Sequence, residues 1–243
     1  MEELNISKRL QYIAGLVKIG GILADIGTDH GYLPIFLAKN DICRHIIAMD
    51  VRKGPLKKAE ANIKAYGVEE KVSLRLSDGF EKLEKEEADT ITISGMGGRL
   101  IQSILLKGLG KLTKRTKIIV SPQSEIRDFR IFLKQNGFLT LRENMLEEEG
   151  QFYQVIECVY LGGDYSNEVI EESKYRYGKQ PLMEKNESLK KYLLKELATV
   201  NDLIDRLTQL ERKEQALEKR IAQLEFDKQC ICMALEYYKF NMC

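Results

Sequence analysis

Hydrophobic and polar positions follow two different periods along the first two-thirds of the chain. Short apolar runs rich in β-branched residues predict strands, and amphipathic stretches between them predict helices. The strands are expected at Ile22–Ile26, His45–Asp50, Val72–Leu76, Thr90–Ser94 and Lys117–Ser121. The helices are expected at Ser7–Val17, Leu33–Lys39, Pro55–Tyr66, Arg99–Lys107 and Glu125–Gln135. This alternation indicates an α/β domain with a mainly parallel sheet.

The pattern changes where this domain ends. Phe138–Met145 and Tyr153–Tyr160 are both strand-like, and only an acidic segment ending in Gly150 separates them. Parallel neighbours need a long crossover, so these two strands are expected to pair antiparallel as a hairpin. Five parallel strands closed by such a hairpin predict the seven-stranded mixed sheet of a class I, Rossmann-like methyltransferase. An ordinary dinucleotide-binding domain would have another helix at this point.

The C-terminal third has a helical pattern of its own. From Leu182 onward the chain has no Gly and no Pro, and apolar residues recur at heptad spacing. This spacing predicts a coiled-coil extension. We expect a methyltransferase domain over residues 1–163 and a helical coiled-coil domain over residues 164–243. An antiparallel hairpin turning around Gln209–Gln215 would bury the apolar seam within one chain, and an intermolecular coiled coil is the open alternative.

Composition narrows the classes of protein. The chain has 243 residues, a net charge of +1, 44% hydrophobic and 31% charged residues, which are typical of a soluble globular protein. We found no apolar run of the roughly 20 residues that a membrane span needs. The acidic N-terminus is unlike a signal peptide, so we expect a cytoplasmic protein without membrane contact. Five cysteines without paired metal-ligand spacing and only two histidines predict that no metal is bound.

Three acidic residues lie at the ends of successive predicted strands, and together they predict a nucleotide-like cofactor. Asp25 precedes the glycine turn of Gly27 and Gly31, where a carboxylate suits the ammonium of S-adenosylmethionine. Asp50, followed by Val51, is placed to hold a ribose diol. Asp78 and Gly79 are placed to meet the adenine, with Phe80 packed beside its ring. Each acid alone could be a helix cap or a turn residue. Gly27-x-x-x-Gly31 departs from the G-x-G-x-x-G pattern and disfavours NAD.

Three motifs resemble one known family. Residues 25–34 (DIGTDHGYLP), residues 94–98 (SGMGG) and residues 121–123 (SPQ) resemble the bacterial tRNA (adenine-N1)-methyltransferases of the TrmK family. The resemblance covers nearly the whole chain. It implies transfer of a methyl group from S-adenosylmethionine to N1 of an adenine in the D-arm region of tRNA, at position 22. It therefore implies tRNA as the partner.

The same motifs supply candidates for catalysis. Asp29 stands where the broader methyltransferase pattern has a glycine, and we expect it to be catalytic together with His30. The alternative is an Asp side chain that only orders its own loop. A carboxylate near the N6/N1 edge of adenine would stabilise the positive charge that develops on the base and would accept an N6 proton. Gly95 and Met96 are expected beside the cofactor.

Substrate contacts are predicted at two kinds of residue. Gly97, Gly98, Pro122 and Gln123 are expected to meet the target base. Basic clusters are expected to meet phosphates: Lys8 and Arg9, the five cations Lys107, Lys111, Lys114, Arg115 and Lys117, and residues 174–179. Each cluster alone could be a solvated face. Two other functions stay open, a methyltransferase for another RNA or a protein and a non-catalytic cofactor-binding scaffold. The protein is expected to be a monomer or a weak homodimer.

Overall fold

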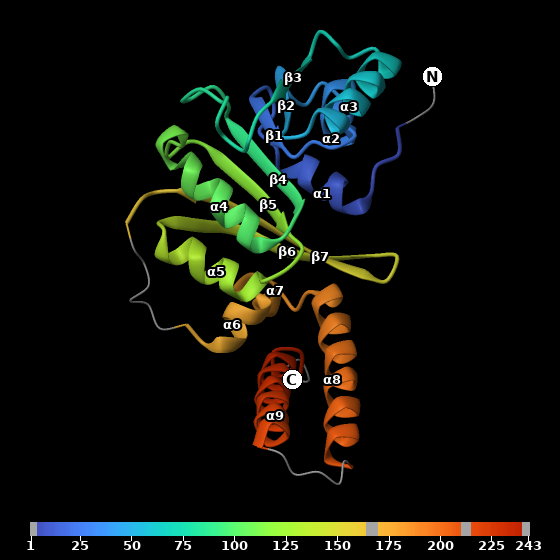
Figure 1. The fold of residues 1–243 in the computed structure, drawn as a ribbon, viewed down its shortest axis with the longest axis vertical. Coiled ribbons are helices and arrows are strands. Elements are labelled where there is room, and N and C mark those ends of the chain that lie inside the picture. The colour runs from blue at the N-terminus through green and yellow to red at the C-terminus, as the bar shows by residue number, and fades with distance from the viewer. Residues whose placement is uncertain (1–3, 164–169, 210–214, 240–243) are drawn as a thin grey trace. The chain divides into compact units, whose positions relative to one another are not determined.

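The computed structural model describes residues 4–163, 170–209 and 215–239. The chain forms two compact units, Met1–Glu168 and Val169–Cys243 (Figure 1). The elements of the first unit are α1 (Lys8–Leu16), β1 (Ile22–Ile26), α2 (Tyr32–Lys39), β2 (His45–Asp50), α3 (Lys53–Tyr66), β3 (Val72–Leu76), β4 (Thr90–Met96), α4 (Gly98–Gly108), the 3-10 turn η1 (Leu109–Lys111), β5 (Lys117–Pro122), α5 (Ile126–Gln135), β6 (Phe138–Glu148) and β7 (Gln151–Tyr160). Those of the second are α6 (Glu172–Tyr177), α7 (Lys179–Met183), α8 (Glu187–Thr208) and α9 (Gln215–Glu236).

All seven strands of the first unit lie in one mixed sheet, as predicted. Their order is β3-β2-β1-β4-β5-β7-β6. The pairs among β1 to β5 are parallel, and β7 runs antiparallel to both β5 and β6. This order places β1 and β4 side by side at the centre. Helices that follow these two strands therefore leave the sheet in opposite directions, which opens a crevice at their carboxyl ends.

The closing hairpin is longer than the sequence predicted. Glu149 and Gly150 form its two-residue connection, and both have positive φ, 51° and 75°. Such a turn matches the twist of antiparallel strands, so pairing continues up to Glu148 and Gln151. The glutamates at positions 147 and 148, expected in the loop, thus belong to β6.

Two apolar layers cover the sheet. Helices α1, α2 and α3 pack on one face, with Leu23 and Ile35 fully buried between them. Helices α4 and α5 pack on the other face (Figure 1). Phe80 is 2% exposed in this second layer, and a Cβ on Gly108 would overlap its ring. Phe80 therefore packs in the core, and the expectation that its ring lies beside the cofactor stays a prediction.

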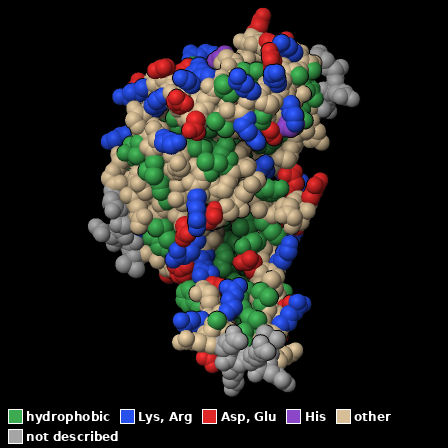
Figure 2. All heavy atoms as spheres, viewed as in Figure 1, with side chains coloured by type: hydrophobic (Ala, Val, Ile, Leu, Met, Phe, Trp, Pro, Cys, Tyr) green, Lys and Arg blue, Asp and Glu red, His purple; other side chains and the backbone are tan. Residues whose placement is uncertain are grey.

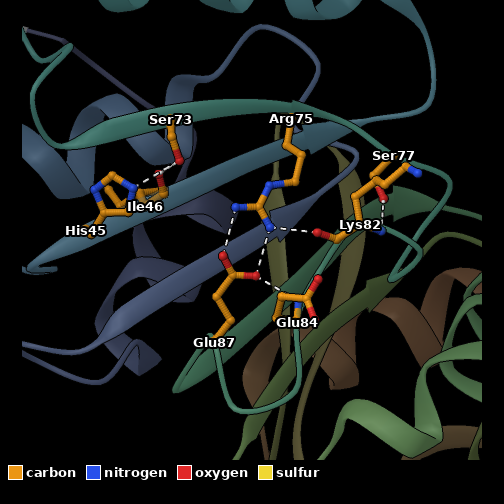
Figure 3. A network of polar contacts seen from close by, with 8 residues as sticks. All are labelled: His45, Ile46, Ser73, Arg75, Ser77, Lys82, Glu84 and Glu87. Carbon is orange, nitrogen blue, oxygen red and sulfur yellow. Dashed lines mark hydrogen bonds and ion pairs between the residues drawn. The ribbon is translucent and has the colours of Figure 1, made fainter.

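A polar network fixes the segment after β3 (Figure 3). Arg75 donates two hydrogen bonds of 2.8 Å to the carboxylate of Glu87 and one of 2.7 Å to the carbonyl of Lys82. The backbone N–H of Glu84 also donates to Glu87. These hydrogen bonds raise the pKa of Arg75 and lower the pKa of Glu87. Hydrogen bonds within the protein thereby hold the segment that carries Asp78 in place without a ligand.

In the second unit, α8 and α9 pack against each other and form an antiparallel helical hairpin (Figure 1). The favoured intrachain hairpin is therefore confirmed. Most of the turn predicted around Gln209–Gln215 lies outside the described residues. Arg176 of α6 donates to Asp227 of α9 at 2.8 Å and lies over the ring of Phe226. Knobs-into-holes packing in this hairpin stays a prediction.

Candidate active site at the carboxyl ends of the strands

A cavity of about 350 Å³ opens at the carboxyl ends of β1, β2 and β4. Its volume is within the range of small-molecule sites. It is lined by Arg9, Leu10, Asp25, Gly27, Thr28, Asp29, His30, Tyr32, Leu33, Asp50, Arg52, Ser94, Gly95 and Met96. A second cavity, of about 420 Å³, is lined by residues that precede β4 and β5, and among them are Lys114 and Arg115 of the predicted basic cluster.

Asp25 is the most deeply buried acid of the lining. It lies in β1, is 4% exposed and accepts a 2.6 Å hydrogen bond from Thr92 Oγ1. Burial raises the pKa of this carboxyl, and the bond from Thr92 lowers it in part. Within the described part of the chain, Asp25 makes no ion pair. A buried carboxylate in this state favours a cationic ligand.

Gly27 lets the loop after β1 lie close to β4. Its φ is +80°, and a Cβ there would overlap Met96 Cε. The N–H groups of Gly27 and Thr28 both donate to the carbonyl of Met49, at 2.8 and 2.9 Å. The loop is thus tied to β2, and the Met96 side chain covers Gly27. Gly31 has a different role, because its missing Cβ lets α2 pack against Ala59 of α3.

Asp50 ends β2 and is 6% exposed. Its Oδ1 accepts the backbone N–H of Arg52 at 2.9 Å and lies 3.8 Å from Arg52 Nε. The carboxylate therefore keeps acceptor capacity toward the cavity, as a ribose diol requires. Val51 is 60% exposed and is not part of the lining.

Asp29 and His30 form the polar rim of the cavity. Asp29 has φ +51°, and its side chain is 61% exposed. His30 Nε2 lies 3.7 Å from Asp29 Oδ2, and the His30 ring stacks on that of Tyr32 with centroids 5.6 Å apart. The structure thus brings both predicted catalytic residues to the same cavity as Asp25 and Asp50. The exposed carboxylate of Asp29 is accessible to a large substrate.

The three glycines at the end of β4 differ in what surrounds them. Gly95 lines the cavity in a bulge of β4 with φ +78°, and a Cβ there would meet no atom within 4 Å. A Cβ on Gly97 would lie 2.9 Å from Ser124 Oγ, and one on Gly98 would lie 2.5 Å from the carbonyl oxygen of Ser124. Gly97 and Gly98 therefore allow α4 to pack against the loop after β5.

Pro122 and Gln123 join the end of β5 to β4 and do not line the cavity. Pro122 is buried and pairs with Met96, whose carbonyl accepts the backbone N–H of Gln123 at 2.9 Å. The Gln123 side chain is exposed. The roles of Gly97, Gly98, Pro122 and Gln123 in substrate binding stay predictions.

Asp78 and Gly79 also lie outside the lining. The carboxylate of Asp78 is exposed and lies 3.3 Å from Lys107 Nζ. Gly79 has φ +53°, and a Cβ there would press against Ile104 of α4. Binding of an adenine ring by these two residues stays a prediction.

Several cations expected to meet phosphates already have partners within the protein. Lys107 pairs with Asp78, Lys111 donates to two backbone carbonyls, and Lys117 lies 2.9 Å from Glu157 Oε1. On the face that Figure 2 shows, basic and acidic side chains are interspersed. Three of the five predicted cations thus have partners within the protein, and phosphate binding by the cluster stays a prediction.

Lys8 and Arg9 are neighbours in sequence but differ in position. Lys8 is exposed, and its backbone N–H donates to Glu148 Oε1 at 2.6 Å. Arg9 lines the cavity, and its Cζ lies 4.8 Å from the ring centroid of Tyr153. Lys8 is exposed and Arg9 is half-buried, and phosphate binding by either residue stays a prediction.

Sequence reasoning missed six residues of the lining: Leu10, Thr28, Tyr32, Leu33, Arg52 and Ser94. All six lie within two positions of a predicted site residue, so extending each motif along the chain would have found them. Leu10 directly follows Arg9 in α1, and the packing of this helix brings both residues to the cavity.

Comparisons with known proteins agree with this geometry. Residues 6–156 match the family model described as a methyltransferase domain. The tRNA (adenine(22)-N(1))-methyltransferase of Bacillus subtilis is 39% identical to this chain over 156 residues. These residues are 64% of this chain and 66% of the relative, so the match spans just under two thirds of that relative's length. The crystal structure of the B. subtilis M1A22 tRNA methyltransferase TrmK has a TM-score of 0.83 and 30% identity, and the match covers 96% of this chain and 100% of that one.

The chain belongs to the TrmK family of methyltransferases. Another similar structure, Streptococcus pneumoniae Sp1610 in complex with S-adenosyl-L-methionine, has a TM-score of 0.82 and 33% identity over 95% of this chain and 100% of that one. Because these matches extend over nearly the whole chain, the helical C-terminal unit also belongs to the TrmK architecture. In the described residues, no helix is long and apolar enough to cross a membrane, and no three metal-ligating side chains gather into a site.

Proposed function

We propose that this TrmK-family chain transfers a methyl group from S-adenosylmethionine to N1 of the adenine at position 22 of tRNA. One observation carries the proposal. A single cavity at the carboxyl ends of the strands combines two buried carboxylates, Asp25 and Asp50, with an exposed one, Asp29. The buried pair suits a small cofactor, and the exposed acid suits a substrate that arrives from solvent.

The residues of the inner cavity fit the cofactor. Asp25 is a buried acid with no ion pair in the described residues, so it suits the ammonium of the methionine portion. Asp50 suits the ribose hydroxyls, since hydroxyl groups donate to its remaining lone pairs. Gly27 and Gly95 allow close approach of the backbone, and Met96 covers the site from β4. When bound, the cofactor supplies an electrophilic methyl group on a sulfonium.

Asp29 is the residue we assign to the reacting base. Adenine N1 has an in-plane lone pair, so its attack requires alignment more than deprotonation. Methylation leaves a positive charge on the base, and a carboxylate at the N6/N1 edge stabilises that charge and accepts an N6 proton. His30, 3.7 Å from Asp29, orients the carboxylate. The stacked ring of Tyr32 gives this rim an aromatic surface.

The adenine must leave its pairing partner before N1 can react, which costs a few kcal/mol in most base-modifying enzymes. Contacts to tRNA phosphates offset this cost. Lys8, on the exposed side of α1, is one candidate contact. Gly97, Gly98, Pro122 and Gln123 are candidates for the base itself, because they join the ends of β4 and β5 next to Met96.

Methyl transfer to defined tRNA tests the proposal. Unmodified tRNA transcripts with adenine at position 22 would be incubated with tritiated S-adenosylmethionine, and the modified nucleoside would be mapped. Matched transcripts with guanine at position 22 serve as the control. We expect N1-methyladenosine only in the first set. Incorporation into both sets would show another target site, and none in either, despite cofactor binding, would contradict the tRNA assignment.

A further inference from the structure

Arg9 is a cation of the cavity that the protein leaves without a full set of partners. Its Nε and Nη1 are buried and have no hydrogen-bond partner among the described residues. Tyr153 of β7 holds the guanidinium from the side, with Cζ 4.8 Å from the ring centroid. A buried N–H group without an acceptor destabilises the folded chain, and more so when the group is charged. Such a group in a ligand cavity points to an acceptor on the ligand.

The acids of the cavity do not fill this role. Asp25 accepts from Thr92, Asp50 accepts from the backbone of Arg52, and Asp29 lies beside His30. None of them forms an ion pair with Arg9 in the described residues. Arg52, the other arginine of the lining, has a side chain that is 73% exposed and lies 3.8 Å from Asp50. Arg9 is half-buried, and of the two arginines of the lining it is the one with no ion pair in the described residues.

The chemistry of the cofactor supplies one anion. S-adenosylmethionine carries a sulfonium, an ammonium, a ribose, an adenine and a single carboxylate. Asp25 and Asp50 suit the ammonium and the ribose, and neither can hold the carboxylate. We propose that Arg9 binds the α-carboxylate of the methionine portion and thereby positions the cofactor in the cavity. This inference rests on the proposed function and deepens it.

The burial of these two Arg9 nitrogens also favours one of two possible anions. The sequence predicted that Arg9 would contact a tRNA phosphate together with Lys8. A phosphate on a tRNA backbone is bulky and reaches exposed cations, whereas Nε and Nη1 of Arg9 are buried. A carboxylate inside the cavity can reach them. The two neighbours Lys8 and Arg9 would therefore serve different ligands.

Two ligands that differ only in the carboxylate measure its contribution to the affinity. S-adenosylhomocysteine keeps it, and S-adenosyl-3-thiopropylamine keeps the ammonium but lacks the carboxylate. Calorimetry would measure both affinities for the wild type and for Arg9→Met, with Arg52→Met as the control from the same cavity. We expect Arg9→Met to weaken binding of S-adenosylhomocysteine about 10- to 100-fold, since charge-assisted hydrogen bonds to a carboxylate are lost. Binding of the amine should not change, and Arg52→Met should affect both ligands alike.

Arg9→Lys is the second variant, in case Arg9→Met does not fold. It keeps a positive charge near Tyr153 but lacks the guanidinium nitrogens, so we expect a smaller loss that is again confined to S-adenosylhomocysteine. The wild type must also prefer S-adenosylhomocysteine to the amine by about tenfold or more. Equal losses for both ligands would assign Arg9 a structural role and overturn the inference. Unchanged cofactor affinity with a raised KM for tRNA would support the phosphate contact that the sequence predicted for Arg9, and it would also overturn the inference. If the wild type bound neither ligand, the proposed function would fail as well.

Discussion

Arg75 and Arg9 lie in two regions of the same unit, and the protein surrounds them differently. Arg75 lies in β3, an edge strand of the sheet, and Glu87 and the carbonyl of Lys82 accept its hydrogen bonds (Figure 3). Arg9 lies in the central cavity, and two of its nitrogens find no acceptor in the described residues. The first region is complete without a ligand, whereas the second is not.

This difference separates groups that stabilise the fold from groups that await a ligand. The Arg75 pair is mutual, because it raises the pKa of the arginine and lowers the pKa of the glutamate. In the cavity, burial raises the pKa of Asp25, so its charged form is disfavoured until a cation arrives. We expect substitutions in the cavity to change function more than stability, and substitutions in the Arg75 network to do the reverse.

The largest effect is expected at Asp29. Asp29→Asn keeps the shape of the side chain and tolerates the positive φ of 51°, so it removes mainly the charge. We expect kcat to fall about 100- to 1000-fold, as for loss of a general acid-base group, with little change in cofactor affinity. Single-turnover kinetics and calorimetry would measure the two quantities. Near-normal turnover by both Asp29→Asn and Asp29→Ala would remove Asp29 from the mechanism.

Asp25 should affect binding next most strongly. Asp25→Asn removes the carboxylate that suits the cofactor ammonium, and we expect S-adenosylhomocysteine to bind about 10- to 100-fold more weakly. Wild-type affinity should also decline as pH falls through the raised pKa of Asp25, whereas the affinity of the variant should stay flat over that range. Calorimetry over a pH series measures both. An identical pH profile in the variant would assign the dependence to another group.

Asp25 also affects the ligand-free protein, with the opposite sign. Its folded pKa lies above the unfolded value, so the folded state binds the proton more tightly. Stability from this group is therefore present at low pH and is lost as pH rises through the folded pKa. Without ligand, Asp25→Asn should thus be at least as stable as the wild type at neutral pH. Thermal unfolding with and without S-adenosylhomocysteine separates the two roles.

Gly27→Ala should affect binding and stability together. The new Cβ overlaps Met96 Cε, and an alanine at φ +80° is strained. We expect a loss of about 1–3 kcal/mol in the free energy of unfolding, together with weaker cofactor binding. The double variant Gly27→Ala, Met96→Ala removes the overlap and leaves the strain. Full recovery in the double variant would show that the overlap alone causes the loss.

The smallest effect is expected at Arg75. Arg75 and Glu87 are 29% and 26% exposed, so Arg75→Met should cost about 1–2 kcal/mol of stability and leave cofactor affinity unchanged. The lowered pKa of Glu87 means that the pair stabilises the fold above the unfolded value of 4.5 and loses this effect as pH falls through the folded pKa. Urea unfolding of Arg75→Met, Glu87→Gln and the double variant measures the coupling. A large loss of cofactor affinity in Arg75→Met would contradict the division between the two regions.

The sequence predicted the strands more accurately than the site. Each parallel strand is a short run that contains at least one β-branched residue, and the predicted bounds of β1, β2 and β3 are those of the structure. The hairpin was predicted from the missing crossover helix, although the positive φ of Glu149 leaves no trace in composition, and its length was underestimated.

For the site, motifs at strand ends predicted Asp25, Gly27, Asp29, His30 and Asp50, because topology brings the ends of parallel strands together. Contacts between distant segments could not be predicted in this way. The environment of Arg9 depends on Tyr153, which lies in a hairpin near the other end of the domain. Asp78 fits the local pattern, but the structure pairs it with Lys107, which lies one helix further along the chain.

The contact between Arg9 and Tyr153 has a consequence for the folding of the chain during its synthesis. Helix α1 leaves the ribosome before the strands of the sheet do, yet it packs against β6 and β7, the last of these strands. Lys8 likewise donates its backbone N–H to Glu148 at the end of β6. Because contacts of such long sequence separation form late, a nascent chain shorter than this hairpin lacks the wall that holds Arg9. Cofactor capture should therefore begin only after β7 has been synthesised, which makes S-adenosylmethionine a ligand of the finished domain and not of its folding intermediates.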